Sequence, residues 1–140
     1  MAARSKARKR ALDILFESDV RGDELSVTLA AWAERSDPPV QPYARELVEG
    51  VAAHRGRIDD VIRQYAAQDW PLERMPAVDR STLRLGVFEL LCCDTPPAVA
   101  IDEAVELAKS LSTDESAGFV NGILAQVLRD KDTLIPLGSE

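Results

Sequence analysis

Pro76-Ala-Val-Asp-Arg-Ser-Thr-Leu-Arg-Leu-Gly-Val-Phe-Glu-Leu-Leu-Cys-Cys93 is the stretch of this sequence that decides its fold. Its apolar residues fall on every side of a helix, whereas a surface helix has one apolar stripe and a polar back. The stretch is longer than a typical strand, so a helix is favoured over a buried strand. It is too short and too often interrupted by charge to cross a membrane. The sequence therefore predicts a central helix that several other helices surround.

The composition outside this stretch also favours helices. The chain has 140 residues, of which 46% are hydrophobic and only 5% are aromatic. This length is enough for one hydrophobic core, and Ala, Leu, Glu and Arg, which favour helices, are plentiful. We expect an all-α fold in a single domain over residues 1–132, followed by a polar, proline-broken tail over residues 133–140 that frays.

Cysteine and histidine usage gives no sign of a metal site. Cys92 and Cys93 are adjacent in an apolar segment, and His54 is the single histidine. Packed thiols in a reducing compartment explain the two cysteines, and no spaced Cys/His pairs are present, so we expect no metal and no cofactor. The first residues lack the long apolar core of a signal peptide, so we expect a cytoplasmic protein without a membrane span.

Charge is distributed unevenly along the chain. The net charge is −7, yet the first ten residues contain no acidic side chain and five basic ones, Arg4, Lys6, Arg8, Lys9 and Arg10. An acidic surface repels the phosphate backbone, whereas a basic segment attracts it. We interpret residues 1–10 as a basic arm that leads into the first helix, with Arg4, Arg8 and Lys9 on its exposed side. A solvated basic tail without a partner is the alternative.

Apolar residues at helical spacing predict further helices on both sides of the central stretch. These stripes lie within residues 7–16, 25–33, 47–51, 58–65, 101–111 and 119–128. A stiff connector, Trp70-Pro-Leu-Glu-Arg-Met-Pro76, precedes the central helix. Its Trp70 is available to pack into the core beneath it.

The last helix has a clear start signal and an unusual interior. Ser112 and Glu115 have the spacing of a capping box, which predicts that the helix begins there. Asn121 and Gly122 are weak helix formers within the same helix. Either a neighbouring helix approaches Gly122 closely, or this surface is kept bare for a ligand.

Five motifs, in order along nearly the whole chain, carry a resemblance to a known family. They are Arg8-Lys-Arg-Ala11 with Leu15-Phe16; Trp70-Pro-Leu-Glu-Arg74 with Val78-Asp-Arg80; Leu83-Arg-Leu85 to Phe88-Glu-Leu90; Ile101-Asp-Glu-Ala-Val-Glu-Leu-Ala-Lys109; and Phe119-Val-Asn-Gly122. Together these motifs resemble the NusB family of transcription antitermination factors.

The resemblance implies a fold and a function. The fold is a compact all-helical one of about seven helices in two packed three-helix subdomains. NusB-like proteins bind the boxA element of ribosomal RNA leader transcripts together with NusE, a protein of the small ribosomal subunit. They act in the RNA polymerase antitermination complex to promote read-through of terminators. The resemblance therefore implies an RNA-binding protein that is not an enzyme.

The resemblance also assigns site residues by position. Arg4, Lys6, Arg8 and Arg10 are expected to contact RNA phosphates, and Glu115, Gly118 and Phe119 are expected to lie near bases. Phe16 and Asp79 correspond to the surface that faces NusE. Phe119 also fits the apolar stripe of its helix, so its role as a stacking platform or as a core residue is left open.

Two other function classes compete with RNA binding. The chain could be a protein-interaction or self-associating module, including a homodimer, that has no RNA affinity of its own. The same helical domain also occurs ahead of a ribosomal RNA cytosine methyltransferase. No glycine-rich nucleotide loop follows a strand in this sequence, and the chain ends without a catalytic domain, so we expect no enzyme.

Overall fold

The fold is all-helical. The computed structural model describes residues 2–35, 39–67 and 70–134, and it contains no strand within these ranges. Its α-helices are α1 (Ala2–Arg21), α2 (Leu25–Arg35), α3 (Pro42–Ala53), α4 (Arg55–Tyr65), α5 (Ala77–Cys92), α6 (Pro97–Leu111) and α7 (Asp114–Arg129). Two short 3-10 helices, η1 (Leu72–Arg74) and η2 (Lys131–Thr133), lie in the connector before α5 and after α7. The predicted all-α class is confirmed, whereas most of the expected tail, 135–140, lies outside the described residues.

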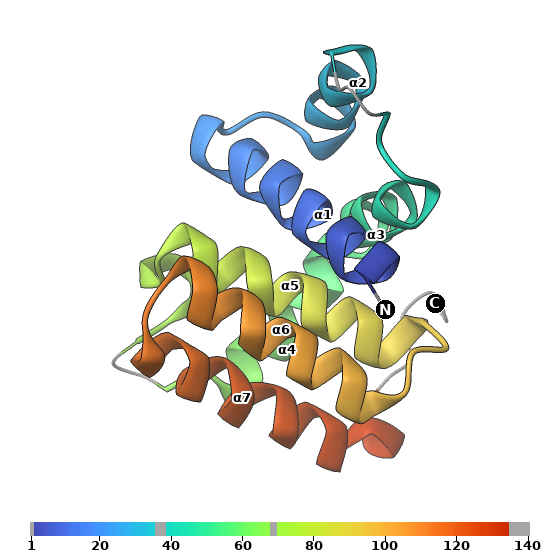
Figure 1. Ribbon diagram of the computed structural model, residues 1–140. Coiled ribbons are helices and arrows are strands. Elements are labelled where there is room, and N and C mark those ends of the chain that lie inside the picture. Colours follow the sequence, from blue (N-terminus) through green and yellow to red (C-terminus); the bar gives the residue numbers. More distant parts are fainter. Residues whose placement is uncertain (1, 36–38, 68–69, 135–140) are drawn as a thin grey trace.

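The helices pack in two groups that meet at α5. Helices α1, α2 and α3 contact one another, and α5, α6 and α7 form a second set that α4 joins through α5 and α7. Figure 1 shows α1, α2 and α3 above α5, with α6 and α7 below it. The arrangement agrees with the two packed subdomains that the family resemblance implies.

Helix α5 is the central helix that its sequence predicts. It contacts α1, α3, α4, α6 and α7, and every residue from 81 to 90 is buried. A helix surrounded in this way has no solvent face, which explains why its apolar residues do not form a single stripe.

Two glycines allow helices to approach each other closely. A Cβ atom at Gly50 of α3 would clash with the ring of Phe88 of α5, and one at Gly86 of α5 would lie 2.8 Å from Cδ1 of Leu124 of α7. Gly122 is different, because a Cβ atom there would meet nothing within 4 Å. No neighbouring helix therefore explains Gly122, and the surface around it is bare.

A buried polar cluster ties α1 and α3 to α5. Glu89 is 1% exposed, and both of its carboxylate oxygens accept hydrogen bonds from Arg8 Nε, at 2.8 and 3.0 Å. The hydroxyls of Tyr43 and Thr95 donate to Glu89 Oε2 at 2.6 and 3.0 Å. Burial, followed by the hydrogen bond to Glu89, raises the pKa of Tyr43 to about 12, so the phenol is protonated at neutral pH. The carboxylate is thus fully satisfied although it lies inside the protein.

The structure corrects the expectation for Arg8. Its side chain is 4% exposed rather than on the exposed side of α1, and Nη1 donates to Glu103 of α6 at 3.1 Å. Burial alone would lower the pKa of Arg8, but the hydrogen bond and the charge of Glu89 raise it overall. The reason for the burial is that Arg8 neutralises the buried carboxylate of Glu89 and also pairs with the partly exposed Glu103. Arg8 is therefore a structural residue rather than an exposed cation of α1.

A second buried pair anchors α4 to the middle of α5. Arg84 donates to the two carboxylate oxygens of Asp59 at 2.8 and 3.1 Å, and both residues are buried. Arg80, one turn earlier, donates to Asp19 of α1 at 2.7 and 2.9 Å. Such two-pronged pairs fix the relative positions of the helices as well as contributing energy.

None of the described helices is long and apolar enough to cross a membrane.

The glycine contacts make a stability prediction. Gly50→Ala should destabilise the protein by about 1–3 kcal/mol, because the new methyl group overpacks against the Phe88 ring. Gly122→Ala is the matched control, since it should stabilise α7 by up to about 1 kcal/mol through helix propensity alone. Urea unfolding measures both free energies. Equal effects of the two substitutions would contradict the close packing of α3 on α5.

The buried cluster makes a second prediction. Arg8→Ala should lower the free energy of unfolding by about 3–5 kcal/mol, because it leaves the buried Glu89 without its cation. Lys9→Ala removes the neighbouring positive charge, whose exposed pair with Asp13 at 2.8 Å is worth only about 0.3–0.5 kcal/mol. Thermal and urea unfolding compare the variants. A loss below about 1 kcal/mol for Arg8→Ala would show that its ion pairs do not hold the fold.

Candidate functional site

The basic residues expected as an arm are the first turns of α1. The helix begins at Ala2 and its first turn contains no acidic residue. No Gly or Pro interrupts this segment, and its alanines favour a helix. Arg4 and Lys6 are exposed, whereas Arg10 is half-buried. The helix therefore fixes the spacing of these cations.

Aromatic rings from α2 and α3 lie beneath two of these cations. The guanidinium of Arg4 lies 4.3 Å from the centroid of the Tyr43 ring, and that of Arg10 lies 5.4 Å from the Trp32 ring. These are cation–π distances. Trp32 falls within the apolar stripe predicted over residues 25–33, and no local sequence signal connects either ring to a cation so far away in the chain.

The same cations differ in whether a carboxylate neutralises them. Lys9 pairs with Asp13, whereas neither Arg4 nor Lys6 has a carboxylate partner among the residues that the structure describes. A small hollow of about 100 Å³ lies beside them, lined by Lys6, Arg10, Pro39 and Gln41. The first turns of α1 thus present two cations, Arg4 and Lys6, that no carboxylate in the described ranges neutralises.

The start of α7 carries the second group of expected site residues. Thr113, rather than the expected Ser112, is the N-cap, and its hydroxyl accepts a hydrogen bond from the backbone N–H of Ser116 at 3.0 Å. The capping box predicted from Ser112 and Glu115 is therefore wrong by one residue, since adjacent hydroxyl residues offer the same chemistry. Glu115 and Gly118 are exposed on the first turns of α7.

Phe119 is neither a fully buried core residue nor a free ring. It is half-buried, and its ring lies against that of Trp70, with centroids 4.2 Å apart and planes tilted by 60°. Leu72 and Met75 fill the core beneath the connector, while Trp70 itself is half-buried. An aromatic pair with a partly exposed surface therefore lies beside the start of α7.

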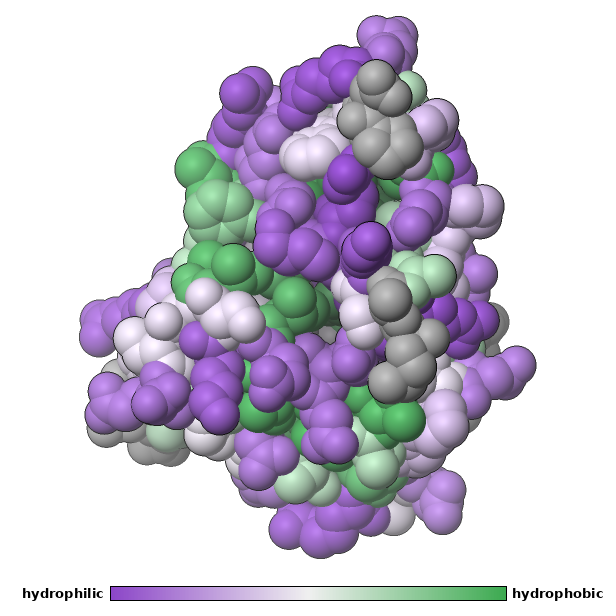
Figure 2. All heavy atoms as spheres, in the orientation of Figure 1, coloured by the Kyte–Doolittle hydropathy of each residue, from purple (hydrophilic) through white to green (hydrophobic). Residues whose placement is uncertain are grey.

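The two residues expected to face a protein partner have different environments. Phe16 is 37% exposed on α1, and Val20, one turn later, is 61% exposed. Figure 2 shows apolar side chains gathered between the upper and lower parts of this face of the molecule. Asp79 is 0% exposed, and Ser116 Oγ donates to its Oδ2 at 2.8 Å. The expectation for Asp79 is therefore corrected, because its carboxylate turns inward from α5 to hold the first turn of α7.

The structure does not bring all the expected RNA-contacting residues together. Arg4 and Arg10 lie against rings of α3 and α2, whereas Phe119 lies against the connector before α5. In Figure 1 the amino end of α1 is at the right, and the orange start of α7 is at the left. The candidate site therefore consists of two separate surfaces.

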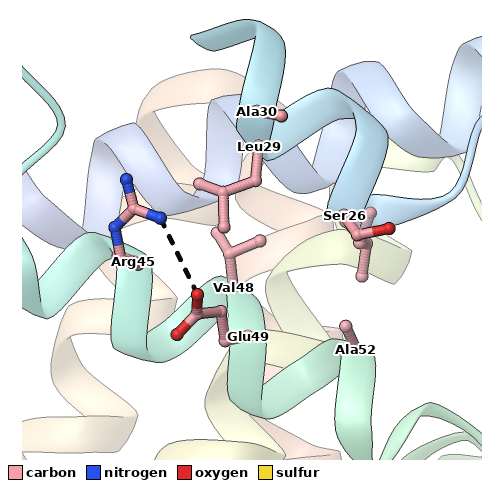
Figure 3. Close-up of a pocket in the computed structure, with 8 residues that line it drawn as sticks. Ser26, Leu29, Ala30, Arg45, Val48, Glu49 and Ala52 are labelled. Carbon is pink, nitrogen blue, oxygen red and sulfur yellow. Dashed lines mark ion pairs between the residues drawn. The ribbon is translucent and has the colours of Figure 1, made fainter. Parts of the chain in front are cut away.

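The most apolar hollow among those described lies elsewhere, between α2 and α3. It has a volume of about 250 Å³, and Leu29, Val48 and Ala52 are among the side chains that point toward it (Figure 3). An exposed ion pair between Arg45 and Glu49, 3.8 Å apart, lies at its rim. The hollow contains none of the expected site residues. Within the described ranges, no cluster of His, Cys, Asp and Glu could hold a metal ion.

Known sequences match the chain along almost its entire length. The NusB family model matches residues 5–129. A transcription antitermination protein NusB from Streptomyces griseus is 57% identical over 132 residues, which cover 90% of this chain and 92% of the relative. The corresponding protein from Kineococcus radiotolerans is 55% identical over 135 residues, covering 96% and 98% of the two chains.

Solved structures share the fold. NusB of T. maritima superimposes with a TM-score of 0.80 at 34% identity, covering 91% of each chain. A second match, with a TM-score of 0.81 and 27% identity, is a crystal structure of antitermination factors NusB and NusE in complex with double-stranded RNA, and it covers 92% of this chain and 98% of that one. On the strength of the family match, the high identities and the shared fold, this chain belongs to the NusB family.

Proposed function

We propose that this protein is a transcription antitermination factor that binds boxA-type single-stranded RNA of ribosomal RNA leader transcripts together with NusE. In this role it joins the RNA polymerase antitermination complex and promotes read-through of terminators. Support comes from the relatives named as antitermination proteins and from the solved complex of NusB, NusE and RNA. We place this action in the cytoplasm, and we assign the protein binding roles and no catalysis.

The observation that carries the proposal is the pair of exposed cations, Arg4 and Lys6, at the start of α1. The chain has a net charge of −7, so its average surface repels RNA. Arg4 and Lys6 are exposed and lack carboxylate partners in the described part of the chain. Phosphate groups are the natural ligands for such cations, and Arg10 beside the small hollow extends the same surface.

The start of α7 is the proposed base-contacting surface. Single-stranded RNA is recognised by stacking of its unpaired bases on aromatic rings, in addition to phosphate contacts. Phe119, supported by Trp70, offers a partly exposed ring, and the bare surface at Gly118 and Gly122 lets a strand approach the helix closely.

Phe16 is the proposed contact with NusE. An exposed aromatic side chain with an exposed valine one turn away is the kind of apolar anchor that protein interfaces use. The acidic remainder of the chain suits a ribosomal protein of opposite charge and discourages nonspecific RNA binding. In the alternative, a protein-interaction module without RNA affinity, the exposed cations of α1 would instead dock an acidic protein partner.

Fluorescence anisotropy of a labelled boxA-type RNA tests the proposal. We expect binding that tightens when NusE is present and weakens as salt rises. The double variant Arg4→Ala/Lys6→Ala should bind about tenfold or more weakly, and each lost phosphate contact should reduce the slope of log affinity against log salt by about 0.7.

Lys9→Ala is the matched control for this experiment. It removes one positive charge from the same turns, but Lys9 is already paired with Asp13, so its effect on RNA affinity should be much smaller. If the RNA does not bind at low salt, with or without NusE, the chain is an interaction module and the proposal fails. If Lys9→Ala weakens binding as much as Arg4→Ala/Lys6→Ala, net charge rather than the exposed cations Arg4 and Lys6 is responsible.

A further inference from the structure

Tyr43 lies between the buried core and the exposed start of α1. It is the second residue of α3, and its side chain is half-buried. Its hydroxyl donates to Glu89 Oε2 at 2.6 Å and lies 3.2 Å from the hydroxyl of Thr95. The same carboxylate is held by Arg8, so one end of the Tyr43 ring is anchored in the core.

The face of the same ring supports Arg4. The Arg4 guanidinium lies 4.3 Å from the ring centroid, and that of Arg8, one helical turn further into the protein, lies 5.7 Å from it. Arg4 is exposed, and no carboxylate among the described residues pairs with it. The ring is therefore what holds this guanidinium in place.

Holding a long cationic side chain in one position has a consequence for binding. A free arginine samples many rotamers, and fixing one of them opposes the binding of a ligand. A ring beneath the guanidinium restricts those rotamers in advance while leaving the N–H groups at its edge available to phosphate oxygens. The outer face of the guanidinium is also a surface on which an RNA base can stack.

We propose that Tyr43 is a positioning residue for RNA binding: its ring, packed against the Arg4 guanidinium, holds Arg4 in the orientation that meets the RNA. The inference rests on the proposed function, because it acts on the same RNA-binding surface. It adds a residue of α3 to that surface and connects the buried carboxylate to the exposed cation.

Two substitutions separate this role from a purely structural one. Tyr43→Phe keeps the ring beneath Arg4 but loses the hydrogen bond to Glu89. Tyr43→Leu loses both. A structural role through Glu89 predicts that the two variants behave alike in RNA binding, whereas the positioning role predicts that only Tyr43→Leu weakens it.

The test is a double-mutant cycle on RNA affinity, measured with the labelled boxA-type RNA and NusE at a temperature where thermal unfolding shows every variant to be folded. Tyr43→Leu should weaken binding by about two- to fivefold, the size of an exposed cation–π contact. In the Arg4→Ala background the same substitution should have no further effect, because Tyr43 acts through Arg4. Tyr43→Phe should bind like the unmodified protein although it is less stable.

Three outcomes overturn the inference. The first is an equal loss from Tyr43→Leu with and without Arg4, and the second is a loss in Tyr43→Phe as large as in Tyr43→Leu. If Tyr43→Leu does not fold, NMR of Tyr43→Phe provides the test. When RNA is added, the signals of the aromatic ring at position 43 should then shift together with those of the Arg4 side chain. The third outcome that overturns the inference is that these ring signals do not move. Failure of the unmodified protein to bind RNA is a different result, since it removes the proposed function and this inference together.

Discussion

The rest of the structure depends on a carboxylate buried at the centre of the protein. Glu89 of α5 is 1% exposed, so its negative charge must be matched by hydrogen bonds from inside the protein. Arg8 of α1 and Tyr43 of α3 supply them, and Thr95 adds a third donor. Apolar packing determines which helices meet at α5, while this requirement fixes how α1 and α3 are oriented on it.

The need to match the buried charge of Glu89 also separates the basic residues of α1 into buried and exposed ones. Arg8 pairs with the carboxylates of Glu89 and Glu103 and is buried, whereas Arg4, one turn earlier, packs against the Tyr43 ring and stays exposed. A helix periodicity of 3.6 residues places both side chains on the same side of α1, at different depths. A charge run that appears uniform in the sequence thus combines one structural cation with others that the fold leaves exposed. The Tyr43 ring contacts both Arg4 and Arg8.

Sequence patterns predicted the helices, which depend on residues that are close together in the chain. The apolar stretch around Leu85 identified the central helix, and helical stripes identified its neighbours. The burial of Arg8 was missed because its partners are 81 and 95 residues away, and the inward turn of Asp79 was missed because Ser116 is 37 residues away. The sequence places charge on a helix, but only the packing of distant helices decides whether that charge faces solvent or another charge.

NMR of the arginine Nε–H groups tests most directly whether Arg8 serves the fold and Arg4 meets the RNA. The signals are followed during titration with boxA-type RNA in the presence of NusE. The Arg8 signal should exchange slowly with solvent, because Nε is hydrogen-bonded to the buried Glu89, and it should stay in place as RNA is added. The Arg4 signal should move as the complex forms. An Arg8 signal that exchanges rapidly, or that moves as far as the Arg4 signal, would contradict the assignment of Arg8 to the fold and Arg4 to the RNA.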